Sequence, residues 1–179
     1  MNLLFIGDVV GQSGCDFLES RMYKLKREYD IDVTVVNGEN SAQGNGITPQ
    51  SYRQLLNIGA DVVTTGNHSF RRREAEELYD TNEQLLRPAN YPEGVMGHGV
   101  TYIDMCPYKI AVVNLMGTMY MEAVENPFNY VDKLLESIDT PNIIVDFHAE
   151  TTSEKKAMGF YLQKRCTAVL GTHTHVQTA

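Results

Sequence analysis

The chain has 179 residues, of which 42% are hydrophobic and 21% are charged. These proportions are typical of a soluble globular protein with a sizeable core. The formal net charge of -8 at pH 7 argues against a broad electrostatic footprint on duplex nucleic acid or on an anionic membrane. We therefore expect a single domain over residues 1–179, with neither duplex nucleic acid nor a membrane among its partners.

The cysteines and the N-terminus indicate the cellular setting. The three cysteines, Cys15, Cys106 and Cys166, are odd in number and far apart, so neither a disulfide framework nor a zinc knuckle is expected. The first apolar run lacks a basic region before it and is too short for a signal peptide, and no later stretch could span a bilayer. These features predict a cytoplasmic protein with reduced thiols.

Apolar runs alternate with amphipathic or capped segments along the chain. The runs predict strands that start at Leu3 and near Ile31 and that cover residues 61–65, 142–147 and 167–171. Helices are predicted over Ser13–Tyr29, from Thr48 to Gly59, and over residues 71–79, 128–138 and 153–164, the last capped by Thr152 or Ser153. Residues 100–105 and 108–114 predict a hairpin. Repeated alternation of strand and helix indicates parallel strands covered by helices.

Five apolar runs each lead into a short turn that carries polar side chains. In chain order they are Asp8, Glu39, Asn40, Asn67, His68, His148, His173 and His175. Parallel strands in an open sheet place their carboxyl ends along one edge. We therefore expect these side chains, dispersed in the sequence, to converge in one crevice.

The mixture of side chains at these strand ends indicates a transition-metal site. Imidazole together with carboxylate suits Zn, Mn, Fe, Co or Ni, whereas Ca and Mg sites are built from oxygen ligands. A carboxylate such as Glu39 can bridge two ions about 3.5–4 Å apart. Because Asp8 and Glu39 are the two formal carboxylates, two cations would leave the site net positive and suited to an anionic substrate. The candidate ligands are Asp8, Glu39, Asn40, Asn67, His148, His173 and His175.

The ordered motifs resemble those of the calcineurin-like metallophosphoesterases: Gly7-Asp8, Gly38-Glu39-Asn40, Gly66-Asn67-His68, the strand-end His148 and Gly171-Thr172-His173-Thr174-His175. Longer segments resemble the bacterial YmdB-like branch more closely: Phe5-Ile6-Gly7-Asp8-Val9-Val10-Gly11, Val36-Asn37-Gly38-Glu39-Asn40, Arg87-Pro88-Ala89-Asn90 and Asp146-Phe147-His148-Ala149-Glu150. The resemblance covers the whole chain. It implies an α/β fold, the metallophosphoesterase-type αββα sandwich, with a metal site at the carboxyl ends of the strands.

The resemblance also implies roles for these residues. One metal would be held by Asp8, Glu39, Asn40 and His175, and the other by Glu39 as the bridge together with Asn67, His148 and His173. Members of the branch act as 2′,3′-cyclic-nucleotide 2′-phosphodiesterases. This activity implies attack by a metal-bridging hydroxide, protonation of the leaving 2′ oxygen by His68 as general acid, and a 3′-nucleotide product. Iron is the expected metal, with manganese and zinc as alternatives.

The chain departs from the pattern of the wider superfamily at three points. Val10 stands where a further ligand, usually histidine, is expected, and Ser69 replaces the acidic residue that commonly follows the catalytic histidine. Family members also continue beyond the H-x-H motif, so we expect a domain truncated at its C-terminus with an incomplete second sheet. Two other functions stay open: a phosphomonoesterase or phosphoprotein phosphatase with the same metals, and a non-catalytic regulator that senses a nucleotide. Assembly into a homo-oligomer is also left open.

Three other features each have two interpretations. His98 is either a solvated loop residue or a residue whose loop reaches the crevice. The run Arg71-Arg72-Arg73 is either a solvated face or a contact to phosphate or to another subunit. Asp146 and Glu150, which flank His148, either orient metal ligands or are simply hydrated.

Overall fold

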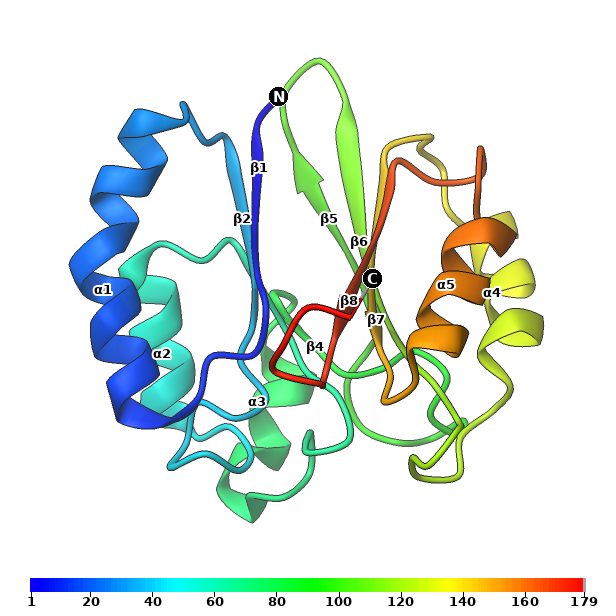
Figure 1. Ribbon diagram of the computed structural model, residues 1–179, viewed down its shortest axis with the longest axis horizontal. Coiled ribbons are helices and arrows are strands. Elements are labelled where there is room, and N and C mark those ends of the chain that lie inside the picture. The colour runs from blue at the N-terminus through cyan, green and yellow to red at the C-terminus, as the bar shows by residue number, and fades with distance from the viewer. Residues whose placement is uncertain (179) are drawn as a thin grey trace.

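The computed structural model describes residues 1–178 and arranges them in four layers: helices, a sheet, a second sheet, and helices (Figure 1). The first sheet has the order β1-β2-β3-β4 with parallel neighbours, and the second has the order β5-β6-β7-β8, in which β5 runs antiparallel to β6. Helices α1 and α2 cover the first sheet, and α4 and α5 cover the second. The expected αββα sandwich is confirmed.

The elements have the following bounds. The strands are β1 (Leu3–Ile6), β2 (Val33–Asn37), β3 (Val62–Thr64), β4 (Leu85–Leu86), β5 (Val100–Asp104), β6 (Lys109–Met116), β7 (Ile143–His148) and β8 (Ala168–Thr172). The helices are α1 (Gly11–Glu28), α2 (Pro49–Ile58), the 3-10 turn η1 (Arg73–Ala75), α3 (Glu76–Thr81), α4 (Pro127–Glu136) and α5 (Thr152–Tyr161). Within residues 1–178, no helix is long and apolar enough to cross a membrane.

The structure differs from the sequence expectations in three elements. The helix expected over residues 71–79 begins only at Glu76, because acidic residues suit the positive end of the helix dipole and the preceding arginines oppose it. Strand β4 is absent from the predictions, since two residues are too few to show a hydrophobic period. The cap of α5 is Thr151, whose side chain accepts a hydrogen bond from the backbone N–H of Glu154. It precedes the expected cap by one residue.

Alternation along the strands divides the core into layers. In β2, Val33 and Val35 belong to the cluster between the two sheets, together with Ile144 of β7. Val36 belongs instead to the cluster beneath α1 and α2, because successive strand residues point to opposite faces. A third cluster packs Phe147 and its neighbours beneath α4 and α5. Burial on both faces fixes the register of the strands and therefore the positions of their carboxyl ends.

Candidate metal centre

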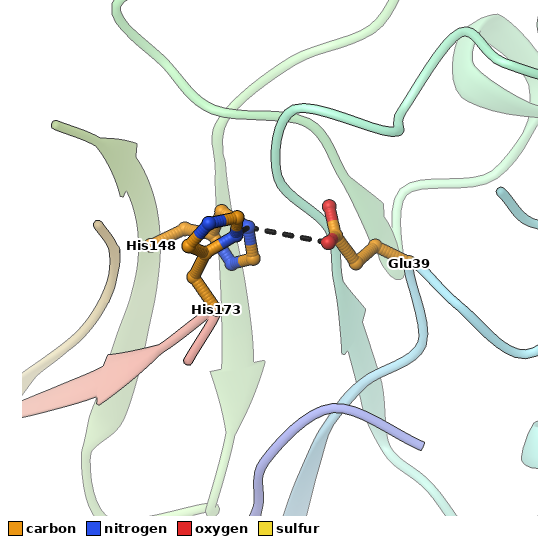
Figure 2. Close-up of side chains that lie close together, drawn as sticks. All are labelled: Glu39, His148 and His173. Atoms are coloured by element: carbon orange, nitrogen blue, oxygen red, sulfur yellow. Dashed lines mark hydrogen bonds and ion pairs between the residues drawn. The ribbon is translucent and has the colours of Figure 1, made fainter. Parts of the chain in front are cut away.

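Strands of both sheets end at one edge of the sandwich, where Glu39 occupies the centre. Glu39 follows β2, and its side chain is fully buried. Its Oε1 atom lies 3.2 Å from His148 Nε2, and its Oε2 atom accepts a hydrogen bond from the backbone N–H of His68 at 3.1 Å. Figure 2 shows the Glu39 carboxylate facing the His148 and His173 rings. Glu39, which follows a strand of the first sheet, therefore lies next to His148 and His173, which lie at strand ends of the second sheet.

Three side chains surround the Nε2 atom of His148. This atom lies 3.1 Å from Asn67 Oδ1, 3.1 Å from His173 Nδ1 and 3.2 Å from Glu39 Oε1. Glu39, His148 and His173 each offer one ligand atom within 4.8 Å of the others. The four residues that were predicted to share one metal are therefore neighbours, although they lie at the ends of four different strands.

A second group of side chains surrounds the His175 ring. His175 Nε2 lies 3.1 Å from Asp8 Oδ2 and 3.3 Å from Asn40 Nδ2. The same Asn40 amide donates to Glu39 Oε1 at 3.0 Å. The Asn40 oxygen accepts a hydrogen bond from His68 Nδ1 at 2.8 Å and has a second lone pair that this bond does not use. The structure thus brings all seven predicted ligands together in two groups that share Glu39.

The H-x-H segment lies just beyond β8, in a turn with unusual backbone geometry. The φ angles of His173 and His175 are 95° and 56°. Non-glycine residues rarely adopt this left-handed conformation, which persists only where the surrounding structure holds it. Here the backbone N–H of His173 donates to Asp8 Oδ1 at 3.2 Å. This hydrogen bond joins the turn that carries His173 and His175 to Asp8, which follows β1.

The pKa values of Glu39 and His148 both shift toward the charged forms. Burial alone would raise the pKa of Glu39, but the hydrogen bond and charge of His148, with help from His68, lower it to about 2. Burial opposes protonation of His148 as well, yet the hydrogen bond and charge of Glu39 raise its pKa. Burial and the charge of His148 lower the pKa of His173. The pocket therefore stabilises positive charge at His148 Nε2, where the predicted ligands meet.

The donor atoms of this pocket fit a transition-metal ion. Among residues 1–178, no group donates a hydrogen bond to the buried Asp8 Oδ2 atom, although His175 Nε2 lies 3.1 Å away. A buried carboxylate oxygen without a donor is unfavourable unless a cation compensates its charge. Imidazole, carboxylate and amide oxygen together form the mixed donor set that Fe, Mn and Zn accept.

A chain of hydrogen bonds behind His148 orients its ring. Burial raises the pKa of Asp146 to about 6, whereas the hydrogen bonds that this carboxylate receives favour its ionised form. It accepts hydrogen bonds from Asn37, Thr64 and Thr172, the last at 2.7 Å. Because the Thr172 proton points to Asp146, the Thr172 oxygen accepts from His148 Nδ1, 2.9 Å away. His148 Nδ1 therefore keeps its proton, and Nε2 is the atom that can exchange a proton for a cation.

This hydrogen-bond chain predicts the effect of changing Thr172. Thr172→Val should weaken metal binding by about 10- to 100-fold, because His148 loses the acceptor that orients its ring. Thr172→Ser keeps the hydroxyl and should keep the affinity. Titration calorimetry of metal-stripped protein with Mn²⁺ measures the affinities, and the unfolding temperature reports stability separately. Equal affinity in the valine variant and the unmodified protein would contradict the role of Thr172.

Gly66 provides the space that the His148 ring occupies. A Cβ atom at position 66 would overlap that ring. Gly66→Ala should therefore lower the free energy of unfolding by about 1–3 kcal/mol through overpacking, and metal content should fall with it. Denaturant unfolding and elemental mass spectrometry measure the two effects. Gly159→Ala is the matched control, since a Cβ there meets open space among the described residues and alanine favours the helix.

His68 enters the pocket from the turn after β3. Its Nδ1 atom lies 2.8 Å from Asn40 Oδ1 and 3.5 Å from Glu39 Oε1. Both neighbours are acceptors, so Nδ1 carries a proton and Nε2 is left to exchange one. The side chain is partly exposed, and it lines the same pocket as Glu39, Asn40, His173 and His175.

The structure also shows the contacts of three other features for which the sequence left two interpretations. The fifth histidine, His98, lies apart from the site, with its Nε2 atom 3.1 Å from a backbone carbonyl. Arg71 pairs with Glu122 at 3.5 Å, and Arg72 donates to backbone carbonyls of the 42–45 turn. These two arginines of the run thus hold neighbouring loops in place. Glu150 Oε2 lies 2.9 Å from His173 Nε2 and so orients a predicted ligand.

Sequence reasoning missed the residues behind the ligands. Asn37, Thr64 and Thr172 join Asp146 in a buried network between the two sheets. Each is the last residue of its strand, so a polar residue closing an apolar run is a signal that could have marked them. The sequence indicates that Asp146 could orient ligands, but its pairing with Thr64 could not be predicted, because the two lie 82 residues apart and in different sheets.

Comparison with known proteins assigns this fold and site to a family. The family model described as YmdB-like protein matches residues 4–179. The chain belongs to the YmdB-like family. The resemblance inferred from the motifs is thereby confirmed.

Three relatives of this YmdB-like chain are informative. It is 46% identical to the 2′,3′-cyclic-nucleotide 2′-phosphodiesterase of Bacillus subtilis (strain 168), across 100% of the chain and 69% of that protein. A hypothetical protein from Thermus thermophilus shares 39% identity with a TM-score of 0.94, over 99% of this chain and 69% of that one. A phosphatase from Mycoplasma pneumoniae shares 33% identity with a TM-score of 0.92, over 99% of this chain and 65% of that one. The names confirm the expectation of a phosphoester hydrolase.

Proposed function

We propose that this chain hydrolyses 2′,3′-cyclic nucleotides to 3′-nucleotides as a dinuclear metal-dependent phosphodiesterase. The observation that carries the proposal is the meeting of the candidate ligands in two groups that share the Glu39 carboxylate. The 46% identity to the Bacillus subtilis phosphodiesterase supports the substrate class. Two cations beside Asp8 and Glu39 would leave the site net positive, as an anionic phosphodiester requires.

The proposed metal ligands form two sets. One ion would be held by Asp8, Glu39, Asn40 and His175, and the other by Glu39, Asn67, His148 and His173. Iron is the metal we propose, with manganese and zinc as alternatives, since this donor set accepts all three. Bound there, the ions would supply Lewis acidity that activates water and neutralises the phosphate oxygens.

His68 is the proposed general acid. The departing ribose 2′ oxygen is a poor leaving group, and a proton from His68 Nε2 would neutralise it as the phosphorus–oxygen bond breaks. Asn40 and Glu39 hold the ring through Nδ1, which leaves Nε2 for this transfer. Positioned proton donation typically contributes about 10²–10⁴ in rate. The phosphate then stays on the 3′ oxygen.

A second candidate function is phosphomonoester hydrolysis, which the Mycoplasma pneumoniae relative's description as a phosphatase favours. Phosphoprotein phosphatase activity would use the same metals. A nucleotide sensor without catalysis would bind the ligand and release no product. We further propose a cytoplasmic setting, in keeping with three free cysteines. The alternative of a homo-oligomer is tested by measuring the molecular mass in solution.

One experiment separates these functions. Protein purified without chelator is analysed for metal by elemental mass spectrometry, and the same sample is assayed with 2′,3′-cyclic AMP and with p-nitrophenyl phosphate. About two transition-metal ions per chain and release of 3′-AMP are expected. Faster turnover of the monoester would favour the phosphatase, and metal with nucleotide binding but no product would favour the sensor. A protein without metal would overturn the proposal.

A further inference from the structure

The segment that follows β6, residues 117–122, is tied at both ends to the candidate site. Its first residue, Gly117, donates a backbone hydrogen bond to the carbonyl of His148 at 2.9 Å. At its other end, Glu122 pairs with Arg71 at 3.5 Å and faces the Tyr91 hydroxyl at 3.4 Å. Arg71 in turn donates its backbone N–H to the carbonyl of His68. The segment therefore runs from the proposed metal ligand His148 to the side chain of Arg71, in the loop that follows the proposed general acid.

The middle of this segment is clamped by Glu154, a mostly buried residue in the first turn of α5. The Glu154 carboxylate accepts hydrogen bonds from the backbone N–H and the hydroxyl of Thr118 at 2.9 and 3.2 Å, and from the Met119 N–H at 3.3 Å. The Met119 sulfur also lies 3.8 Å from the hydroxyl of Thr151. In Figure 1 the segment lies at the end of the sandwich to which β7 and β8 point.

Tyr120 sits at the tip of this clamped segment in a strained and exposed position. The backbone N–H of Met121 donates to the Thr118 carbonyl at 3.4 Å, which makes Tyr120 the third residue of a tight turn. Its φ angle is 61°, a value that glycine or asparagine adopts far more readily than a bulky residue at this position. The side chain is 87% exposed, so it gains almost no burial against the described residues. A strained aromatic side chain that the fold leaves exposed suggests an external partner.

We propose that Tyr120 is a stacking platform for the base of the nucleotide substrate, an inference that rests on the proposed function. Its anchors place the segment beside His148 and beside the loop after His68, and the proposal places the base of a nucleotide whose phosphate occupies the metal centre against this segment. An exposed phenol ring offers a flat apolar face, and stacking of bases on aromatic rings is a common mode of nucleotide binding. Stacking accepts any base, since each has a π face, and favours the larger purines.

The geometry of the turn makes this proposal sharply testable. Tyr120→Asn suits the left-handed backbone and should keep or raise the unfolding temperature while it weakens nucleotide binding. If Tyr120 had a purely structural role, Tyr120→Asn should instead lower the unfolding temperature. Tyr120→Phe keeps the ring and should keep the affinity. Tyr23→Ala is the matched control, because Tyr23 is 73% exposed on α1 in the outer helical layer.

The measurement is titration calorimetry of the metal-loaded protein with two probes, 3′-AMP and the base-free methyl riboside 3′-phosphate. We expect Tyr120→Asn to weaken 3′-AMP binding by about 5- to 150-fold more than it weakens binding of the base-free probe. An equal effect on both probes, or none on 3′-AMP, would overturn the stacking role. Turnover of 2′,3′-cyclic AMP is measured in parallel. Its absence would count against the proposed function, whereas the calorimetry tests Tyr120 on its own.

Discussion

Glu39→Gln is expected to abolish stable occupancy of both metal positions. The Glu39 carboxylate lies 3.2 Å from His148 Nε2 and accepts from the Asn40 amide at 3.0 Å, so it belongs to both groups of predicted ligands. A neutral amide removes one of the two formal carboxylates and the bridging capacity. Metal affinity should fall by more than the about 10- to 100-fold that is typical when a residue hydrogen-bonded to a metal ligand is replaced. Turnover of 2′,3′-cyclic AMP should fall to background. Elemental mass spectrometry and a product assay measure these effects.

The variant Glu150→Gln is a control that distinguishes loss of the bridging carboxylate from loss of a carboxylate beside a ligand. Glu150 lies 2.9 Å from His173 Nε2 and its side chain is 47% exposed, so Glu150→Gln should lower metal affinity far less than Glu39→Gln. Circular dichroism establishes that both variants are folded. Full metal content and near-normal turnover in the Glu39 variant would show that this carboxylate is not the bridge.

His68→Asn is expected to retain the metals and to lose turnover. The His68 ring lines the pocket, and its Nδ1 is held by Asn40, but within residues 1–178 it makes no hydrogen bond or ion pair with His148, Asn67 or His175. Removal of a general acid should lower kcat for 2′,3′-cyclic AMP by about 10²–10⁴. The decrease should be much smaller for bis(p-nitrophenyl) phosphate, because p-nitrophenolate leaves without a proton.

A loss of turnover that depends on the leaving group would show that His68 donates a proton and does not bind the metal. His98→Asn is the control, since His98 lies in a loop and contacts a backbone carbonyl away from the site. It should leave both reactions unaffected. An equal loss for both substrates in the His68 variant, or a loss of metal, would assign His68 to another role.

The candidate ligands could be predicted from sequence because they lie at the ends of apolar runs or on the short turns that directly follow them. The boundary between such a run and its polar ending is a local property, so Asp8, Glu39 and His148 stood out without knowledge of the fold. The alternation of strands and helices also predicted most of the elements. The capped helix Pro49–Ile58 illustrates this, with Thr48 before it and Gly59, in the left-handed conformation, after it.

Other features depend on contacts between distant segments. The strand ends were expected along one sheet, yet β1, β2 and β3 belong to the first sheet, and β7 and β8 to the second. Periodicity within a strand shows which side chains share a face, but it carries no information about which sheet the strand joins. The crevice is therefore shared between two sheets.

The sequence by itself determined which residues could supply chemistry, because the residue types and their strand-end positions are local properties. Only the tertiary structure decided how they are held. Asp146 reaches His148 through Thr172 and bonds across the sandwich to Asn37 and Thr64, and the strain at Tyr120 arises from a turn clamped by α5. Such contacts join residues far apart in the chain, and they form only when both sheets and their helices pack together.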